Sequence, residues 1–583
     1  MTTRRKDMKV SKYLMLSMVS VLFVVPFTNV MAQDGGGCIY DLRNGAVYFN
    51  ENRTKRDDEG NPQQNRLIVH SRNADTGDLT EVQRVESGGY GNDDGIVTSG
   101  QFSVIVQENI LGSRAHVMMI NPGFDPSSDN LKGSVSAFQV NKCDVVLTDT
   151  KTTRGQEPRS VTRDSRVLNG TDRDLVAVIN AGSGTVEFNG CPGLPEGFLT
   201  PVGSTCGPRP EIEDFEPTSY IIYKFNSRTG RFNQIARRNT RDDDGDPAQI
   251  SFINEGRQLL ISQRNTFFAL GNGTEDDIIE VVKLRADGAP MFDRSGFADA
   301  LATMLGYNFD GASPDDIAPR FTNPVVSETS GNDNFGFSVI PVEGRQYNDC
   351  VTFTHGSFQQ RGQGGTSQFT INRFGAKVRV QPNKPDLGDD TCWTQVSYRT
   401  STVYASAFFN SGTSIRKIDL ETCVMEDGGP PVIAPGGVPQ FSGEVENIRH
   451  RISSHPANDA NDGAIPTDQS DFLYQAGGLD LALTRNKEGT EWLYIFNAPV
   501  PFAGIPGAGP GGTTLVQNSS GDYVWIPGGP TTIAVYRVVE DCTGETTIFQ
   551  GSAGEDCRPG DLILTGRYAP GDISSSSFGI AAW

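Results

Sequence analysis

Short apolar runs separated by turn residues dominate the hydrophobic pattern along the chain. The clearest example spans residues 246–266, where the run 250–253 is followed by a turn at 254–257 and a second run at 259–262. Each run is long enough for a buried strand and too short for a helix. Gly256 can take the positive φ that such a turn needs. The stretch therefore predicts two adjacent strands joined by a tight turn.

The same strand–turn–strand pattern returns further along the chain. It is found at residues 394–408 and again at 481–497, with turn residues near the centre of each stretch. A unit of two short strands does not bury both of its faces, so it needs further copies beside it. Repeated units of this size indicate a β-propeller or a solenoid.

Seven such units account for most of the 583 residues, and the 66 glycines and 33 prolines suit many short strands joined by turns. The units lie near residues 45–91, 102–140, 175–225, 246–288, 335–371, 392–420 and 477–539. We expect an all-β fold, a seven-bladed β-propeller with loop and helical insertions. Radial repetition leaves few exposed sheet edges once the ring closes. We expect the C-terminal strand 579–582 to pair with the first blade, so that N- and C-terminal strands close the ring.

The first residues have the features of a secretory signal. Basic residues from Arg4 to Lys12 precede the apolar run 13–27, and Val30-Met31-Ala32 offers small residues for cleavage. The apolar run is shorter than the ~20 residues that a membrane-spanning helix needs. We therefore expect a signal peptide at residues 1–32 and a secreted protein, or a periplasmic one in a bacterium, with no membrane span.

The remaining residues, 33–583, are expected to form a single propeller domain with four insertions. The insertions lie near residues 187–217, 291–320, 426–471 and 499–520. The segment 294–307 places apolar residues at helical spacing and predicts a surface helix.

The charge of the chain restricts its partners. Fifty Lys and Arg stand against 71 Asp and Glu, which gives a net charge of −21. Such a surface repels nucleic acid and anionic lipid, and it attracts cations, including calcium. The run Asp242-Asp243-Asp244-Gly245-Asp246 does not match an EF-hand loop, so an acidic turn is the favoured interpretation. No His-x-His or His-Glu-x-x-His spacing indicates a metal centre.

Nine cysteines follow the signal, and none forms a Cys-x-x-Cys pair. After a secretory signal, disulfides are the expected state. We expect the pairs Cys191–Cys206 and Cys542–Cys557, each within its own loop. Cys392–Cys423 and Cys38–Cys143 are further expected pairs, which leaves Cys350 as a buried thiol.

Six short motifs occur in the order and spacing of a known family. They are Asn180-Ala181-Gly182-Ser183-Gly184-Thr185, Asp246-Pro247-Ala248-Gln249, Phe335-Gly336-Phe337, Cys392-Trp393, Gly478-Leu479-Asp480-Leu481-Ala482 and Gly579-Ile580-Ala581-Ala582. On these motifs the chain, from about residue 40 to its end, resembles the lactonase-type seven-bladed β-propellers, and among them the secreted members most. That family includes 6-phosphogluconolactonase-like and carboxymuconate-cyclase-like proteins. The resemblance implies a lactone-forming or lactone-opening site near the propeller axis, built from His, Arg and Glu, with no organic cofactor.

The chain departs from the catalytic pattern of that family. Its enzymes have a His-containing sequence followed by an Asp-x-Gly-x-Asp strand, whereas the corresponding positions here read Thr98-Ser99-Gly100-Gln101, and no such strand follows. Because a fold does not fix a function, enzymatic activity stays open at this point.

Candidate catalytic residues follow from the chemistry of lactone hydrolysis, which needs a group that activates water and a cation that stabilises the oxyanion. Among the five histidines, His355 follows an apolar strand and precedes a glycine. Together with Arg264 and Arg416 from other blades, it is our candidate for an acid–base site at the axis. The alternative is a hydrogen-bonded structural histidine.

Two functions therefore remain. The favoured one is a secreted propeller that binds a protein, a glycan or a cell-surface partner on one face of the ring, because the loops are long and the catalytic pattern is missing. The other is an extracellular lactonase or cyclase that acts on a small lactone or carboxylate at the axis.

Overall fold

The structure is a computed structural model of the 583-residue chain, which divides into two compact units, Met1–Ile39 and Tyr40–Trp583. It describes residues 38, 40–53, 63–91, 103–108, 114–123, 132–164, 167–168, 171–172, 174–182, 185–188, 198–201, 216–241, 246–264, 277–292, 323–328, 334–341, 348–356, 364–385, 391–407, 413–425, 432–433, 439–440, 448–451, 476–499, 513–517, 523–527, 532–542, 558–568 and 578–583. The expected signal peptide, the expected helix at 294–307 and most of the four expected insertions lie outside these residues.

Seven antiparallel sheets of four or five strands make up the second unit, and no helix occurs among its described residues. From the inner to the outer strand, blade 1 is β37 (Phe578–Ala582), β1 (Ala46–Asn50), β2 (Gln64–Arg72) and β3 (Leu79–Tyr90); blade 2 is β4 (Val104–Glu108), β5 (Ala115–Asn121), β6 (Ser134–Val140) and β7 (Val145–Thr152). Blade 3 is β8 (Pro158–Asp164), β11 (Leu175–Asn180), β14 (Ser219–Asn226) and β15 (Arg231–Asn239); blade 4 is β16 (Asp246–Ile253), β17 (Gln258–Arg264), β18 (Ile278–Lys283) and β19 (Val325–Glu328).

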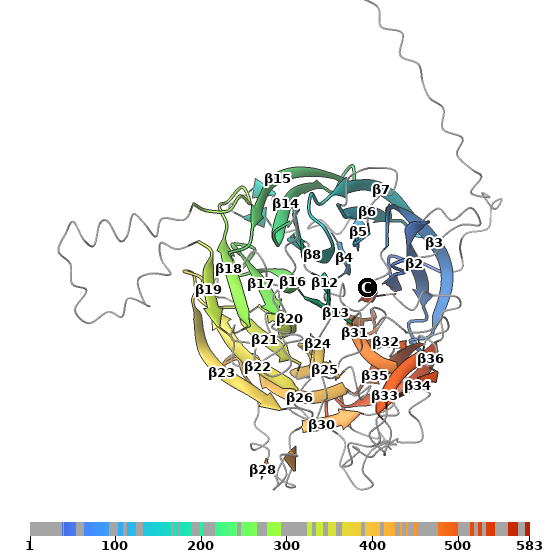
Figure 1. Ribbon diagram of the computed structural model, residues 1–583. Coiled ribbons are helices and arrows are strands. Elements are labelled where there is room, and N and C mark those ends of the chain that lie inside the picture. The colour runs from blue at the N-terminus through green and yellow to red at the C-terminus, as the bar shows by residue number, and fades with distance from the viewer. Residues whose placement is uncertain are drawn as a thin grey trace, which may run out of the picture. The chain divides into compact units, whose positions relative to one another are not determined.

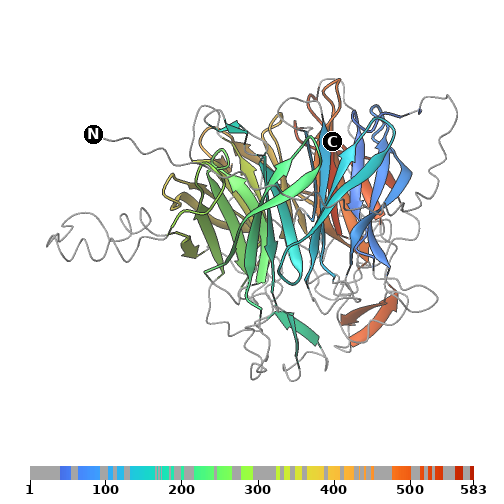
Figure 2. The same ribbon diagram turned by 90° about the horizontal axis from the view of Figure 1, so that it is seen from above.

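The remaining three blades follow the same order. Blade 5 is β20 (Asn334–Ile340), β21 (Cys350–His355), β22 (Gly365–Ile371) and β23 (Lys377–Pro385); blade 6 is β24 (Thr391–Ser397), β25 (Thr402–Ala407), β26 (Thr413–Asp419) and an outer edge shared by β27 (Val424–Met425) and β30 (Ile448–Arg451). Blade 7 is β31 (Ala476–Arg485), β32 (Glu491–Pro499), β35 (Thr532–Val538) and β36 (Leu562–Tyr568). Four two-stranded ribbons are inserted in sequence between strands of blades 3, 6 and 7 (Figures 1 and 2): β9 (Val167–Leu168) with β10 (Thr171–Asp172) and β12 (Thr185–Phe188) with β13 (Phe198–Pro201) in blade 3, β28 (Val432–Ile433) with β29 (Pro439–Gln440) in blade 6, and β33 (Thr513–Gln517) with β34 (Tyr523–Pro527) in blade 7.

The seven sheets form a closed ring. Each inner strand contacts the inner strands of both neighbouring blades, and these strands surround the centre of Figure 1. Ring closure depends on β37, which pairs antiparallel with β1 at Val47↔Ala582, Tyr48↔Ala581 and Phe49↔Ile580. The predicted seven-bladed propeller, closed by strands from the two ends of the sequence, is therefore confirmed.

The hairpin on which the sequence analysis began forms as expected. Strands β16 and β17 pair from Asp246↔Arg264 to Ile253↔Gln258. The turn between them holds Asn254, Glu255 and Gly256 at φ values of 51°, 55° and 71°. With three consecutive left-handed residues the chain reverses within the four residues 254–257, so the two apolar runs follow each other closely.

Apolar side chains are buried mainly between blades. Met118 and Ile120 of β5, for example, share a cluster with Val176 and Val178 of β11 in the next blade. Because neighbouring blades cover both faces of the inner and middle strands, several of these strands, such as β11, read as continuous apolar runs. No helix among the described residues is long and apolar enough to cross a membrane.

One disulfide corrects the expected cysteine pairing. Cys350, at the start of β21, is bonded to Cys423, which precedes β27, with 5.6 Å between their Cα atoms. Cys392 lies near the start of β24, whereas Cys423 follows the far end of β26, so the expected Cys392–Cys423 pair would have to span the length of a strand. Cys392 instead keeps a buried thiol, the role that we had assigned to Cys350.

The other expected pairings stay predictions. Cys38, Cys143 and Cys542 are disulfide-bonded. Cys191, Cys206 and Cys557 lie outside the described residues.

Candidate functional site

The three residues predicted from the sequence are all buried within blades. His355 ends β21 and Arg264 ends β17, so both are on second strands, while Arg416 is on β26, a third strand. Their exposed fractions are 0%, 1% and 2%. None of the three lies on one of the inner strands that surround the axis.

His355 is held by hydrogen bonds on both ring nitrogens. Its Nδ1 lies 3.1 Å from Oδ1 of Asn334, and its Nε2 lies 2.7 Å from Oγ of Ser367. Burial, with a smaller contribution from the charge of Lys377, lowers the pKa of His355 to about 3. The imidazole is therefore neutral throughout the physiological range, whereas a general base works best with a pKa near the working pH.

Arg264 contacts the first residues of β20, the strand that begins with Asn334. Its guanidinium carbon is 4.9 Å from the ring centroid of Phe335, the residue that follows Asn334. The start of β20 thus contacts both His355 and Arg264. A catalytic role for these residues stays a prediction. Arg416 is one blade further on, opposite Val403 of β25 and Ile448 of β30.

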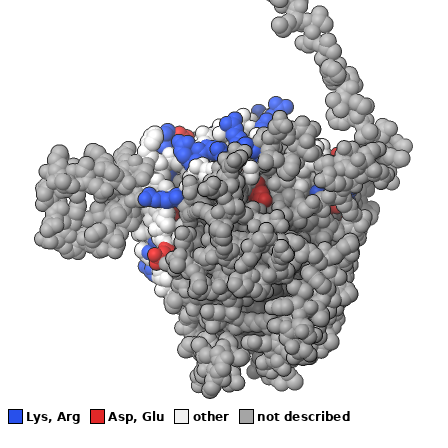
Figure 3. Space-filling model, viewed as in Figure 1, with Lys and Arg blue, Asp and Glu red and all other residues white. Residues whose placement is uncertain are grey.

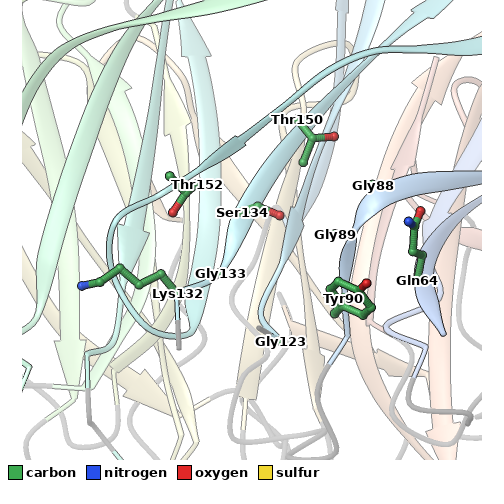
Figure 4. A pocket seen from close by; sticks show the side chains of 10 residues that line it. All are labelled: Gln64, Gly88, Gly89, Tyr90, Gly123, Lys132, Gly133, Ser134, Thr150 and Thr152. Carbon is green, nitrogen blue, oxygen red and sulfur yellow. The ribbon is translucent and has the colours of Figure 1, made fainter. Parts of the chain in front are cut away.

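A pocket lies between the outer strands of blades 1 and 2, at the end where β3 and β7 finish (Figure 4). Its volume is about 340 Å³. The lining residues are Gln64, Gly88, Gly89, Tyr90, Gly123, Lys132, Gly133, Ser134, Thr150 and Thr152. In Figure 4, Gln64 and Tyr90 stand on one side, Lys132 and Thr152 on the other, and Ser134 and Thr150 between them.

Glycine backbone forms much of the pocket wall. A Cβ atom on Gly89 would lie 2.4 Å from Oγ of Ser134, and one on Gly133 would lie 2.2 Å from Cδ of Pro158. A Cβ atom on Gly123 would lie 1.9 Å from the carbonyl oxygen of Gly91. Any larger residue would clash at these positions, so the close approach of blade 2 to blade 1 at Gly89 and Gly123, and to blade 3 at Gly133, depends on glycine.

The buried side-chain amide of Asn121 forms hydrogen bonds with four polar side chains at or next to the pocket. Its Nδ2 donates to Oγ of Ser134 at 3.1 Å and to Oγ of Ser136 at 2.8 Å. Its Oδ1 accepts from Oγ of Ser87 at 2.7 Å and from Nδ2 of Asn65 at 3.0 Å. Because Asn121 donates to Ser134, the Ser134 hydroxyl keeps its own proton for a ligand.

Thr150 supplies the complementary group. Its Oγ1 donates to the carbonyl oxygen of Ser87 at 2.6 Å, and Oγ of Ser136 donates to the same carbonyl at 2.7 Å. With its proton used in this way, Thr150 offers lone pairs as an acceptor. A donor and an acceptor therefore lie on neighbouring strands of blade 2, where Ser134 is opposite Thr152 and Thr150 is opposite Ser136.

Lys132 occupies the rim. Its Nζ donates to Oε1 of Glu216 at 2.7 Å and to the carbonyl oxygen of Arg154 at 3.3 Å, and its side chain is 34% exposed. Among the described lining residues there is no His, Asp, Glu or Cys. These residues suit recognition by hydrogen bonds, and they include no acid–base pair.

The sequence analysis did not identify this pocket. Gly88-Gly89-Tyr90-Gly91 was interpreted only as the end of the first unit. A signal does exist, since glycines cluster at 88–91, at Gly123 and at Gly133, each next to a strand end. Which strand ends meet in space was not evident from one sequence.

In the part of the chain that the structure describes, no group of three or more His, Cys, Asp or Glu could hold a metal ion. Residues 242–245 of the acidic run lie outside that part, so the acidic turn expected there stays a prediction.

Comparison with known proteins gives similarity to solved structures alone. No family model and no curated protein matches. A putative 6-phosphogluconolactonase from Bacteroides uniformis is 13% identical over 66% of this chain and 95% of its own, with a TM-score of 0.31. The periplasmic gluconolactonase PpgL from Pseudomonas aeruginosa is 12% identical over 80% and 99%, with a TM-score of 0.31, and AztD from Citrobacter koseri is 9% identical over 93% and 98%, with a TM-score of 0.33.

The blade arrangement itself decides the fold. Seven sheets in a closed ring, each built outward from an inner strand, make this protein a seven-bladed β-propeller, as its resemblance to the lactonase-type propellers implied.

Proposed function

We propose that this protein is a binding propeller of an oxidising compartment, outside the cell or in the periplasm, and that it takes a hydroxyl-rich ligand, a glycan, in the pocket between blades 1 and 2. The observation that carries the proposal is the fixed pair of Ser134 and Thr150, one hydroxyl left to donate and the other to accept. Sugar hydroxyls both donate and accept, so such a pair matches them.

The size and composition of the pocket support this ligand class. A volume of about 340 Å³ is at the lower end of the range for small-molecule sites and suits one sugar ring of a longer chain. Tyr90 adds an aromatic side chain to the wall. A protein partner would need a much larger interface than this pocket provides.

Binding is favoured over lactone chemistry because the candidate general base is unsuited to it. His355 is fully buried, hydrogen-bonded on both nitrogens and has a pKa lowered to about 3. The Cys350–Cys423 disulfide supports an oxidising location, because such bonds are rare in the cytosol.

A glycan array probed with the labelled protein tests the proposal. We expect binding to a defined set of oligosaccharides, and we expect Ser134→Ala to weaken it about tenfold, the effect of one lost hydrogen bond in a desolvated site. Thr80→Ala is the matched control, since Thr80 is exposed on β3 away from the pocket lining. Binding that is equal in both variants, or no binding to any glycan, would overturn the proposal.

A further inference from the structure

Two buried side-chain amides connect blade 1 to the pocket. Asn65 follows Gln64, which lines the pocket, and Asn121 ends β5 in blade 2. Both amides are 0% exposed, and neither is among the described residues that line the pocket. Nδ2 of Asn65 donates to Oδ1 of Asn121 at 3.0 Å, and Nδ2 of Asn121 donates to Oγ of the pocket residue Ser134 at 3.1 Å. We call Asn65, Asn121 and Ser134 the amide relay.

The backbone fixes the orientation of the Asn65 amide. Its Oδ1 accepts from the backbone nitrogens of Arg53 at 3.1 Å and Arg66 at 2.8 Å. Because a backbone N–H is always a donor, the atom of Asn65 that meets these two groups has to be the carbonyl oxygen. The Nδ2 atom of Asn65 therefore faces Asn121 and Asn50, and it also donates to Oδ1 of Asn50 at 2.9 Å.

Asn65 determines which way the Asn121 amide points. The other three partners of Asn121 are the hydroxyls of Ser87, Ser134 and Ser136. A hydroxyl rotates to donate or to accept, so these three groups satisfy the Asn121 amide in either orientation. The Nδ2 atom of Asn65 donates and never accepts, so it requires Oδ1 of Asn121 beside it. With Oδ1 held there, Nδ2 of Asn121 is directed to Ser134.

Charge does not account for selection in this pocket. Lys132 is the only charged residue among the described lining residues, and its Nζ is paired with Oε1 of Glu216 at 2.7 Å. The Lys, Arg, Asp and Glu side chains that Figure 3 shows are at the surface, whereas Asn65 and Asn121 are uncharged and buried. Selection among ligands therefore depends on which groups of the pocket donate and which accept.

We infer that Asn65 is a positioning residue that sets the hydrogen-bond polarity of the pocket: through Asn121 it holds Ser134 as a donor, so the ligand presents an acceptor to Ser134. The inference rests on the proposed glycan-binding function and narrows its ligand. The sugar group at Ser134 is an oxygen that accepts, and a group that only donates is disfavoured there. Reversing the Asn121 amide reverses this rule, because Ser134 then donates to Oδ1 of Asn121 and offers the ligand only lone pairs.

Fluorinated sugars test the inference, because a fluorine that replaces a hydroxyl accepts a hydrogen bond but does not donate one. The probes are methyl β-D-glucopyranoside, methyl β-D-galactopyranoside and methyl α-D-mannopyranoside, each with its monodeoxy and monodeoxyfluoro derivatives, titrated against the full-length protein by ligand-observed NMR. At one position of one sugar we expect the fluoro derivative to bind within about twofold of the parent and the deoxy derivative to bind about tenfold more weakly. Ser134→Ala is expected to remove this difference between the fluoro and deoxy derivatives.

Two variants reverse the polarity of the relay. In Asn121→Asp the second carboxylate oxygen accepts from Ser134, and in Asn65→Asp the carboxylate accepts from Nδ2 of a reversed Asn121 amide. We expect each variant to bind the fluoro derivative about tenfold more weakly than the parent sugar. In the background Ser134→Ala, Asn65→Asp is expected to leave the fluoro-to-parent ratio unchanged, because it acts through Ser134. Asn180→Asp is the matched control, since Asn180 is a buried amide that ends β11 in blade 3, and it should keep the wild-type ratio.

The outcomes separate the inference from the proposed function. A wild-type protein that binds no fluoro derivative better than the matching deoxy derivative overturns the inference without any variant, and so does a ratio that is unchanged in Asn65→Asp or that changes equally in Asn180→Asp. A merely structural role for Asn65 lowers the affinity for all probes alike and leaves the ratio constant. If the sugars bind and Ser134→Ala weakens them while the ratio stays constant, the proposed function stands without the inference. If no probe binds, both proposals fail.

Discussion

Oδ2 of Asp480 accepts a hydrogen bond from the backbone nitrogen of Ile580 at 3.0 Å, across the joint between blade 7 and blade 1. Oδ1 of the same carboxyl accepts from the backbone nitrogen of Leu481 at 2.8 Å. Asp480 is on β31 and Ile580 is on β37, so one side chain connects the two inner strands between which the ring closes. Asp480 is 4% exposed, and burial raises its pKa to about 7 although both backbone hydrogen bonds lower it.

This carboxyl predicts a stability that depends on pH. Its pKa in the folded protein, about 7, lies above the reference value of 3.8, so folding favours the protonated form. The stabilising contribution is complete below about pH 4 and is lost as the pH rises through 7, by up to about 1.4 kcal/mol for each pH unit in between.

Urea unfolding at pH 5, 6, 7 and 8 measures this effect. The free energy of unfolding of the wild type is expected to fall relative to that of Asp480→Asn as the pH rises, because the amide does not ionise. A constant difference between the two proteins at all four pH values would contradict the prediction.

The disulfide between blades 5 and 6 predicts a second effect on stability. Cys350 and Cys423 are separated by 73 residues, and closing a loop of this length stabilises a protein by about 4 kcal/mol on the loop-entropy model. We expect Cys350→Ala/Cys423→Ala to lower the free energy of unfolding by up to this amount. Cys392→Ala is the matched control, because it removes a buried cysteine side chain that is not part of a disulfide.

Peptide mapping without reductant checks the linkage itself. It should recover a peptide pair that joins Cys350 to Cys423 and leave Cys392 open to alkylation after unfolding. A recovered Cys392–Cys423 pair would show that the blade 5–blade 6 bond is wrong.

We expect His355 to contribute to the stability of the folded protein. Replacing it with alanine leaves Asn334 and Ser367 without their buried partner, which is expected to cost about 2–3 kcal/mol of the free energy of unfolding. Because its pKa of about 3 lies below the reference value of 6.5, the wild-type residue also contributes a loss of stability as the pH falls from 6.5 toward 3.

A lactone screen decides whether the residue does more. Glycan binding by a folded His355→Ala protein is expected to equal that of the wild type. Turnover of a sugar lactone or a homoserine lactone that disappears in this variant, while the far-UV circular dichroism is unchanged, would establish the catalytic role that the sequence suggested.

Thr150→Val is expected to lower the affinity for glycan, because valine has nearly the shape of threonine but lacks its hydroxyl. Valine removes the hydroxyl that donates to the Ser87 carbonyl and offers lone pairs to the pocket. We expect glycan affinity to fall about tenfold and stability to fall by about 1 kcal/mol, the net value of one hydrogen bond. Thr148→Val, which removes a hydroxyl bonded to Ala137 and Gly230 away from the lining, should affect stability alone.

Sequence patterns predicted the ring better than its individual strands. Apolar runs such as 259–262 and the terminal motif 579–582 carried enough information to predict the blades and their closure. The inner strand β8, with the sequence Pro-Arg-Ser-Val-Thr-Arg-Asp, lies outside the predicted unit 175–225, because its two arginines and two hydroxyl residues give no apolar run. In the structure that strand is buried throughout, with Arg163 paired to Asp174 at 2.9 Å and Arg159 to Glu157 at 3.3 Å.

The pocket was beyond sequence reasoning for a different reason. Ser134 and Thr150 are unremarkable residues on neighbouring strands of blade 2, and Gly89 belongs to blade 1. Their meeting depends on the angle between two blades and on the absence of side chains at three glycines. Histidine and arginine attract attention in a sequence because of their chemistry, whereas a binding surface made of hydroxyls and backbone does not.

The position of β37 at the far end of the sequence also governs the order of biosynthesis. The partner strand β1 is translated near the beginning, and its inner edge has no strand to pair with until the ribosome has passed residue 578. Blades 2 to 6 can assemble before β37 has been translated, but the ring of blades is not closed until then. A nascent chain in this condition carries an exposed strand edge, the kind of surface on which chaperones and aggregation compete.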